Sequence, residues 1–130
     1  MNRTQHLKVM LVDKDESFLS LMRLIVQSNG PAEISLSRTA QQALTTFESF
    51  KPDLVFMDIT LSGMEGSQVL HGILDKRVAC RILIVTALSQ ESVWEYISLP
   101  SSIGYIGKNM PIPMIRQAVR NALNCSVFSS

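Results

Sequence analysis

The stretch from Lys51 to Gly66 decides the fold, and it reads Lys-Pro-Asp-Leu-Val-Phe-Met-Asp-Ile-Thr-Leu-Ser-Gly-Met-Glu-Gly. Its apolar run from Leu54 to Met57 is too short for a helix and follows the helix breaker Pro52, which predicts a strand buried on both faces. That strand ends on the carboxylate of Asp58. In an open α/β sheet, ligands bind at the carboxyl ends of the strands, because the following loops form a crevice there. Asp58 is therefore either an acid presented in such a crevice or a residue that only ends the strand.

The composition describes one globular domain. The chain has 130 residues, of which 46% are hydrophobic, and this is enough to bury a core without disulfides or metals. Lys and Arg number 12 against 11 Asp and Glu, so the net charge gives no reason to expect a nucleic-acid or membrane partner. The first six residues are polar, and no apolar run approaches the ~20 residues that cross a bilayer. We expect residues 1–6 to form a disordered N-terminal tail and the protein to be cytoplasmic.

Strand-like and helix-like patterns alternate along the chain. Each predicted strand is a short apolar run, and each predicted helix repeats apolar residues at a spacing of three and four. Strands that alternate with helices in this way are typical of a parallel sheet, so we expect a doubly wound α/β fold with five helices on both faces of a five-stranded parallel sheet. The expected strands are residues 7–12, 32–36, 54–57, 80–85 and 103–106, and the expected helices cover residues 18–26, 39–51, 67–76, 90–98 and 110–123.

Four polar residues follow these strands: Asp13, Asp58, Thr86 and Lys108. Because the carboxyl ends of parallel strands lie at one edge of the sheet, we expect the four side chains to converge there. Carboxylate oxygens suit Mg²⁺, which shares phosphate oxygens with one or two protein acids, while a lysine and a hydroxyl suit phosphoryl oxygens. A well-positioned aspartate can itself accept a phosphoryl group, and Asp58 is the candidate.

The motifs around these positions resemble the receiver domain of two-component response regulators. The resemblance implies a flavodoxin-like sheet with strand order 2-1-3-4-5, a receiver domain at residues 7–123, and a C-terminal tail or the start of a linker at residues 124–130. It rests on four motifs in the family's order, namely Val12-Asp13, Pro52-Asp53-Leu54-Val55-Phe56-Met57-Asp58 with Gly63-Met64-Glu65-Gly66, Ile84-Val85-Thr86-Ala87, and Gly104-Tyr105-Ile106-Gly107-Lys108.

The resemblance also assigns the chemistry. Asp58 would accept a phosphoryl group from a histidine kinase or a phosphotransfer protein. Asp13 would hold Mg²⁺ together with Asp58 and the backbone carbonyl of Thr60, and Lys108 would contact the phosphoryl group. The chain would then be a signalling domain rather than an enzyme, apart from self-catalysed phosphotransfer and dephosphorylation.

A switch is implied as well. Thr86 would move toward the phosphate while the ring of Tyr105 turns inward, which is a local event that biases an element with two states. The face that changes would consist of the fourth helix, the fifth strand and the fifth helix. An output partner, an effector domain or a second copy of the chain would bind there, and the chain is either a stand-alone receiver or part of a longer DNA-binding regulator.

One position departs from the family. Receivers place two adjacent acids after the first strand, and the second of these is Lys14 here. Asp15, Glu16 or a water could replace it as metal ligand; otherwise the affinity for Mg²⁺ falls, and the ammonium of Lys14 lies either near Asp58 or in solvent. Two functions stay open: a phosphoacceptor with weakened Mg²⁺ dependence, and an interaction module that works without phosphorylation.

A third function, a metal-dependent phosphatase or nucleotide-binding enzyme on a similar sheet, is disfavoured. The first turn reads Asp13-Lys14-Asp15 and has no glycines to hold a nucleotide phosphate.

Overall fold

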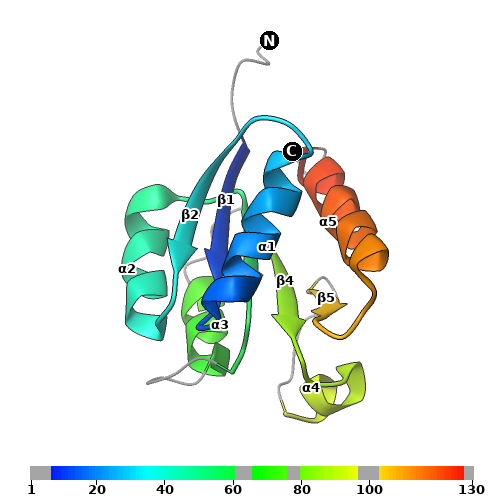
Figure 1. Ribbon diagram of the computed structural model, residues 1–130. Coiled ribbons are helices and arrows are strands. Elements are labelled where there is room, and N and C mark those ends of the chain that lie inside the picture. Colours follow the sequence, from blue (N-terminus) through cyan, green and yellow to red (C-terminus); the bar gives the residue numbers. More distant parts are fainter. Residues whose placement is uncertain (1–6, 61–65, 76–79, 97–102, 128–130) are drawn as a thin grey trace.

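The computed structural model describes residues 7–60, 66–75, 80–96 and 103–127, so the expected N-terminal tail lies outside the described residues. Strands and helices alternate along this part of the chain (Figure 1). Among the described helices, none is both long and apolar enough to cross a membrane. The strands are β1 (Leu7–Val12), β2 (Ala32–Ser37), β3 (Leu54–Met57), β4 (Arg81–Thr86) and β5 (Gly104–Gly107), and the helices are α1 (Glu16–Gln27), α2 (Ala40–Phe50), α3 (Gly66–Asp75), α4 (Gln90–Tyr96) and α5 (Ile112–Val127).

The five strands form one parallel sheet in the order β2-β1-β3-β4-β5, which confirms the predicted fold class and strand order. In Figure 1 the arrowheads of β1, β2 and β4 point toward one edge of the sheet, and the start of β1 and the end of α5 lie toward the other. The register keeps the strand ends nearly level, because Val12 pairs with Met57, Met57 with Ile84, and Thr86 with Gly107. Residues that directly follow the strands are therefore neighbours.

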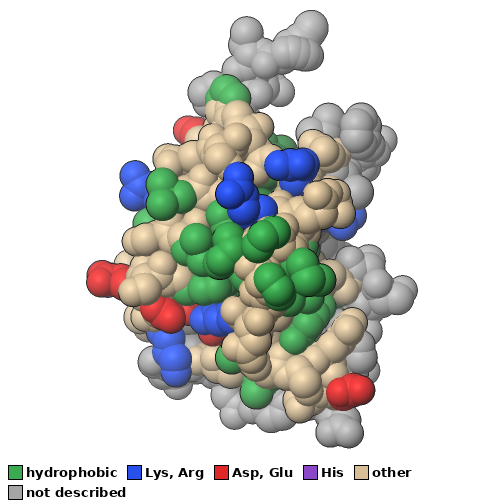
Figure 2. Space-filling model, turned by 45° about the vertical axis from the view of Figure 1, so that its right-hand side comes forward, with side chains coloured by type: hydrophobic (Ala, Val, Ile, Leu, Met, Phe, Trp, Pro, Cys, Tyr) green, Lys and Arg blue, Asp and Glu red, His purple; other side chains and the backbone are tan. Residues whose placement is uncertain are grey.

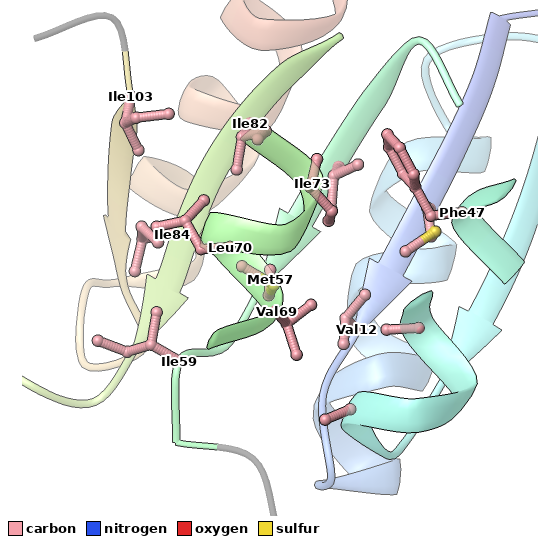
Figure 3. Close-up of a cluster of buried hydrophobic side chains, with 14 of the residues drawn as sticks. Val12, Phe47, Met57, Ile59, Val69, Leu70, Ile73, Ile82, Ile84 and Ile103 are labelled. Carbon is pink, nitrogen blue, oxygen red and sulfur yellow. The ribbon is translucent and has the colours of Figure 1, made fainter. Parts of the chain in front are cut away.

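The core has two layers, one on each face of the sheet. Alternate residues of β3 supply them: Val55 and Met57 belong to the cluster with α2 and α3, whereas Leu54 and Phe56 belong to the cluster with α1 and α5. Figure 3 shows the first cluster, in which Met57 lies among side chains of α3 and β4. Because both faces are covered, β3 can be apolar at every position, which is what its sequence predicted.

Side-chain caps begin the first two helices. The carboxylate of Asp15 accepts hydrogen bonds from the backbone N–H groups of Ser17 and Phe18, at 3.0 and 3.3 Å. Thr39 accepts one from the N–H of Gln42 at 3.1 Å. Each cap satisfies donors that have no partner within the helix, so both helices have a defined first residue.

Several predicted boundaries differ from the structure by one to four residues. Strands β4 and β5 each begin and end one residue later than predicted, so Thr86 is the last residue of its strand rather than the first after it. Helix α5 begins at Ile112, directly after Pro111, whose fixed φ suits a helix start. The helix continues to Val127, past the predicted end at residue 123, because no glycine or proline follows to stop it.

Gly104 gives a test of the strand packing. A Cβ atom at this position would lie 2.9 Å from Cγ of Leu83, its partner in the β4–β5 register. Both backbones are held by strand pairing, so Gly104→Ala should lower the free energy of unfolding by about 1–3 kcal/mol, measured by urea denaturation.

The matched control is Gly72→Ala in α3. The nearest atom to a Cβ there is Cδ2 of Leu44 at 3.2 Å, at the end of a side chain, and alanine gains about 1 kcal/mol of helix propensity over glycine. We expect Gly72→Ala to be as stable as the wild type or more so. A Gly104→Ala protein with unchanged stability would contradict the packing argument.

Candidate functional site

Backbone hydrogen bonds extend the sheet by one residue beyond the strands. This extension places the predicted site residues side by side at the carboxyl edge. The bonds run from Asp13 N–H to the carbonyl of Ser37 at 3.0 Å, from Asp58 N–H to that of Val12 at 2.9 Å, and from Lys108 N–H to that of Thr86 at 2.8 Å.

The ammonium of Lys108 lies between two carboxylates. Its Nζ is 2.8 Å from Oδ2 of Asp13 and 2.9 Å from Oδ2 of Asp58. The side chains of Asp13, Asp58 and Lys108 are 5%, 3% and 14% exposed, so this ion triad is almost removed from water. Two acids and one base leave one net negative charge in the triad at neutral pH.

The second oxygen of each carboxylate is also bound. Oδ1 of Asp58 accepts hydrogen bonds from the N–H of Thr60 at 3.0 Å and from its hydroxyl at 2.8 Å. Oδ1 of Asp13 accepts one from the N–H of Asp15 at 2.9 Å. These bonds fix both carboxylate planes. Sequence reasoning assigned Thr60 only through its carbonyl, although an Asp followed two residues later by Thr is a pattern typical of such a turn.

Phe18 was missed as a site residue. Its ring lies under the Lys108 ammonium, with Nζ 4.8 Å from the ring centroid, within range of a cation–π interaction. Sequence reasoning placed Phe18 in the apolar stripe of the first helix, where it also packs, against the α1–α5 cluster. Its position on the first turn after Asp13 is the signal that could have indicated a second role.

Lys14 and Asp15 do not join the triad. Of the two orientations left open for Lys14, the structure shows the solvent-exposed one, and Lys108 is the ammonium that contacts Asp58. Asp15, predicted as a substitute metal ligand, is exposed and uses Oδ1 to cap α1. The substitution of Lys14 for an acid thus leaves Asp13 and Asp58 as the carboxylates that face one another across Lys108.

Thr86 and Tyr105 both form hydrogen bonds with the backbone of Leu88. The buried hydroxyl oxygen of Thr86 accepts a hydrogen bond from the N–H of Leu88 at 3.2 Å, and the hydroxyl of Tyr105 donates to the carbonyl of Leu88. A Cβ atom at Gly107 would lie 3.2 Å from the Tyr105 hydroxyl, so the absence of a side chain there makes room for the ring. The two predicted switch residues are therefore linked through Leu88.

Burial and ion pairing have opposite effects in the triad. Burial raises the pKa of Asp13, and the hydrogen bond from Lys108 only partly offsets this. Burial alone would lower the pKa of Lys108, but its hydrogen bonds to Asp13 and Asp58 outweigh that effect and leave the pKa raised. Lys108 thus stays charged, while Asp13 is held as a carboxylate at a cost in free energy.

Binding of a divalent cation at this edge would depend on Asp13 and Asp58. Among the described residues, no group of three or more His, Cys, Asp or Glu side chains could hold a metal ion. Asp13 and Asp58 nevertheless aim two oxygens at the same point, which Lys108 occupies. Mg²⁺ commonly binds one or two carboxylates and completes its shell with waters and phosphate oxygens, so the two acids fit this metal with fewer protein ligands than a closed site has.

This chain is similar in sequence to known receiver proteins. The family profile described as response regulator receiver domain matches residues 9–120. Chemotaxis protein CheY of Bacillus subtilis is 27% identical over 118 residues, which cover 90% of this chain and 98% of that protein. The transcriptional regulatory protein PhoP of the same organism is 30% identical over 84 residues, which cover 65% of this chain and 35% of that protein.

Solved structures support the fold. The crystal structure of a CheY-like response regulator receiver domain protein from Methanospirillum hungatei has a TM-score of 0.80 at 23% identity, with 97% of this chain and 100% of that chain covered. At this identity the likeness bears on the fold alone.

The cost of burying Asp13 can be tested through pH. The unfolded carboxyl titrates near 3.8 and the folded one at a higher pH, so the folded state binds the proton more tightly. Because burial raises the pKa of Asp13, its ionised form destabilises the folded state, and we expect the stability of Asp13→Asn relative to the wild type to be highest at pH 7. As the pH falls through the folded pKa toward 3.8, the wild-type protein becomes neutral at this site, and the difference should shrink.

Urea denaturation between pH 7 and pH 3 measures this difference. Asp75→Asn, at an exposed position on α3, controls for the general loss of a negative charge and should show no such trend. A difference that grows on acidification would contradict the assignment of Asp13.

Proposed function

The chain belongs to the response regulator receiver domain family, and on that premise we propose that it is a phosphoacceptor module of two-component signalling, with Asp58 taking a phosphoryl group from a histidine kinase or a phosphotransfer protein. Receiver domains are signalling domains rather than enzymes in the ordinary sense. The proposal assigns this chain the same role, in the cytoplasm.

One observation carries the proposal. Asp58 is a nearly buried carboxylate whose Oδ1 is fixed by two hydrogen bonds from Thr60 and whose Oδ2 contacts the Lys108 ammonium at 2.9 Å. A carboxylate is a weak nucleophile, and positioning together with charge neutralisation makes it useful. Both requirements are met at Asp58.

The transfer itself needs few protein groups. A carboxylate oxygen of Asp58 attacks the phosphorus of a phosphohistidine, an O–P bond forms, and the P–N bond to the donor breaks. The electron pair stays on the imidazole nitrogen, which takes a proton from water. Lys108, already in contact with the accepting carboxylate, would pair with an oxygen of the incoming phosphoryl group.

Mg²⁺ is the cofactor that the family implies. Asp13, Asp58 and the backbone carbonyl of Thr60 would hold it, and when bound it neutralises charge on the phosphoryl oxygens. Lys108 contacts the same carboxylate oxygens, so binding of the cation would require the ammonium to shift. With Lys14 in place of a second adjacent acid, the affinity for Mg²⁺ should be lower than in a receiver that has both acids.

The response would pass through Thr86 and Tyr105. A phosphoryl group on Asp58 offers a new acceptor to the Thr86 hydroxyl, which now accepts from Leu88. If Thr86 turns toward the phosphate, Leu88 loses one of its two contacts, and the remaining bond ties its carbonyl to Tyr105. The loop after β4 would then change its position together with the Tyr105 ring.

The surface next to this loop has the character of a docking face. Leu88, Ile112 and Met114 are 37%, 44% and 54% exposed, although they are large hydrophobic side chains. Figure 2 shows hydrophobic side chains gathered on the face that carries α5, with Lys and Arg side chains nearby. We propose that an output partner or a second copy of the chain binds the face formed by α4, β5 and α5.

A second function has one observation in its favour. Lys108 already closes the gap between Asp13 and Asp58, which is where a metal would bind, so the folded site is complete without a cofactor. A receiver of this kind could act as an interaction module that is never phosphorylated. The next experiment separates the two functions.

Incubation with phosphoramidate and Mg²⁺ tests the phosphoacceptor directly. Intact-mass spectrometry should show the gain of one phosphoryl group by the wild type and none by Asp58→Asn. Asp53→Asn is the matched control, because Asp53 lies in the same stretch but accepts a hydrogen bond from the backbone of Lys8, and it should be phosphorylated like the wild type. A wild-type protein that gains no mass would favour the interaction module.

The effect of Lys14 is tested by calorimetric titration with MgCl₂. Lys14→Asp restores a second adjacent acid, and added ligand charge strengthens binding of hard cations, so we expect about tenfold tighter binding. Lys14→Gln removes the positive charge without adding a ligand and should give a smaller gain. Equal affinities of Lys14→Asp and the wild type would refute the proposed metal site.

A further inference from the structure

Lys108 is held on three sides. Besides the two carboxylate oxygens at 2.8 and 2.9 Å, the ring of Phe18 lies 4.8 Å from Nζ. Lysine has a flexible four-carbon stem and a strongly hydrated head, so an ammonium that is 14% exposed needs contacts that offset the loss of water and of rotamer freedom. An aromatic face attracts such a cation within about 6 Å.

The position of the Phe18 ring follows from the same loop that carries Asp13. The carboxylate of Asp13 accepts a hydrogen bond from the N–H of Asp15. The carboxylate of Asp15 in turn caps α1 by accepting a hydrogen bond from the N–H of Phe18. The ring is partly buried among the α1–α5 cluster, which restricts its motion. Asp15, which the sequence offered as a metal ligand, therefore helps to place the aromatic side of the Lys108 site.

We propose that Phe18 is a positioning residue that holds the Lys108 ammonium across Asp13 and Asp58, and that it thereby sets the balance between Lys108 and Mg²⁺ for the same two carboxylate oxygens. This inference rests on the proposed function of Asp58 as phosphoacceptor. No contact of Phe18 with the phosphoryl group is required, because the ring acts through Lys108.

The proposal has two consequences of opposite sign. If the ring is replaced, Lys108 leaves the carboxylates more often, so Asp13 and Asp58 become more available to Mg²⁺ and the cation binds more tightly. The same freedom takes the ammonium away from the incoming phosphoryl group, so transfer slows even at saturating Mg²⁺. A residue that only supports the fold would weaken both properties together.

The test uses the full chain and the variants Phe18→Leu, Phe18→Tyr and Leu21→Ala. Phe18→Leu should bind MgCl₂ about threefold more tightly by calorimetry and take phosphate from phosphoramidate about threefold more slowly. Phe18→Tyr keeps an aromatic face and should restore both values. Leu21→Ala removes a partly buried side chain of the same helix and cluster, and it should lower thermal stability without this opposed pair of changes.

Nuclear magnetic resonance adds a readout that does not depend on phosphorylation. In the wild type and in Phe18→Tyr, the ε-methylene protons of Lys108 should show a ring-current shift, and Phe18→Leu should lose it. If Phe18→Leu does not fold, Phe18→Met serves as the variant without a ring.

Weaker Mg²⁺ binding in Phe18→Leu, unchanged values, or the same pattern in Leu21→Ala would overturn the proposal, and so would the lack of a ring-current shift in the wild type. If the wild type takes no phosphate at all, the proposed function fails, whereas the Mg²⁺ titration and the ring-current shift still decide the role of Phe18.

Discussion

The contact of one ammonium with two buried carboxylates is the interaction on which the site depends. Taking a charged group out of water costs several kcal/mol unless a partner and further hydrogen bonds compensate it. Lys108 compensates Asp13 and Asp58 together, and Thr60 and Asp15 satisfy the remaining oxygens. Compensation is incomplete, as the raised pKa of Asp13 indicates, and two carboxylates facing one ammonium leave an excess of one negative charge in the triad.

The parallel sheet makes this contact possible. Asp13 and Asp58 are far apart in the sequence, but each directly follows a strand, and β1 and β3 are paired with their ends level. Lys108 reaches them from the fifth strand because its own N–H continues the ladder to the carbonyl of Thr86. The apolar layers on both faces stabilise the sheet, and the polar residues gather at the carboxyl edge, where open α/β sheets bind ligands.

Local patterns were sufficient to predict the fold and the convergence of four residues. A short apolar run that ends on a polar residue locates a strand end, and the parallel topology brings such ends together. The features that could not be predicted are side-chain orientations and contacts between elements that are distant in the sequence. The ring of Phe18 over Lys108, the solvent-exposed orientation of Lys14 and the role of Leu88 between Thr86 and Tyr105 are of this kind, because no sequence period encodes them.

The same geometry explains how a change at a buried acid could reach the surface. Lys108 contacts Asp58 through its side chain and Thr86 through its backbone, and Thr86 contacts Leu88, whose side chain is 37% exposed. Only three residues therefore separate the buried carboxylate from solvent on the α4 side. A ligand shifts an equilibrium only as far as its contacts differ between two states. A phosphoryl group meets this condition, because it adds charge and acceptor oxygens next to Lys108 and Thr86, the two residues that connect Asp58 to Leu88.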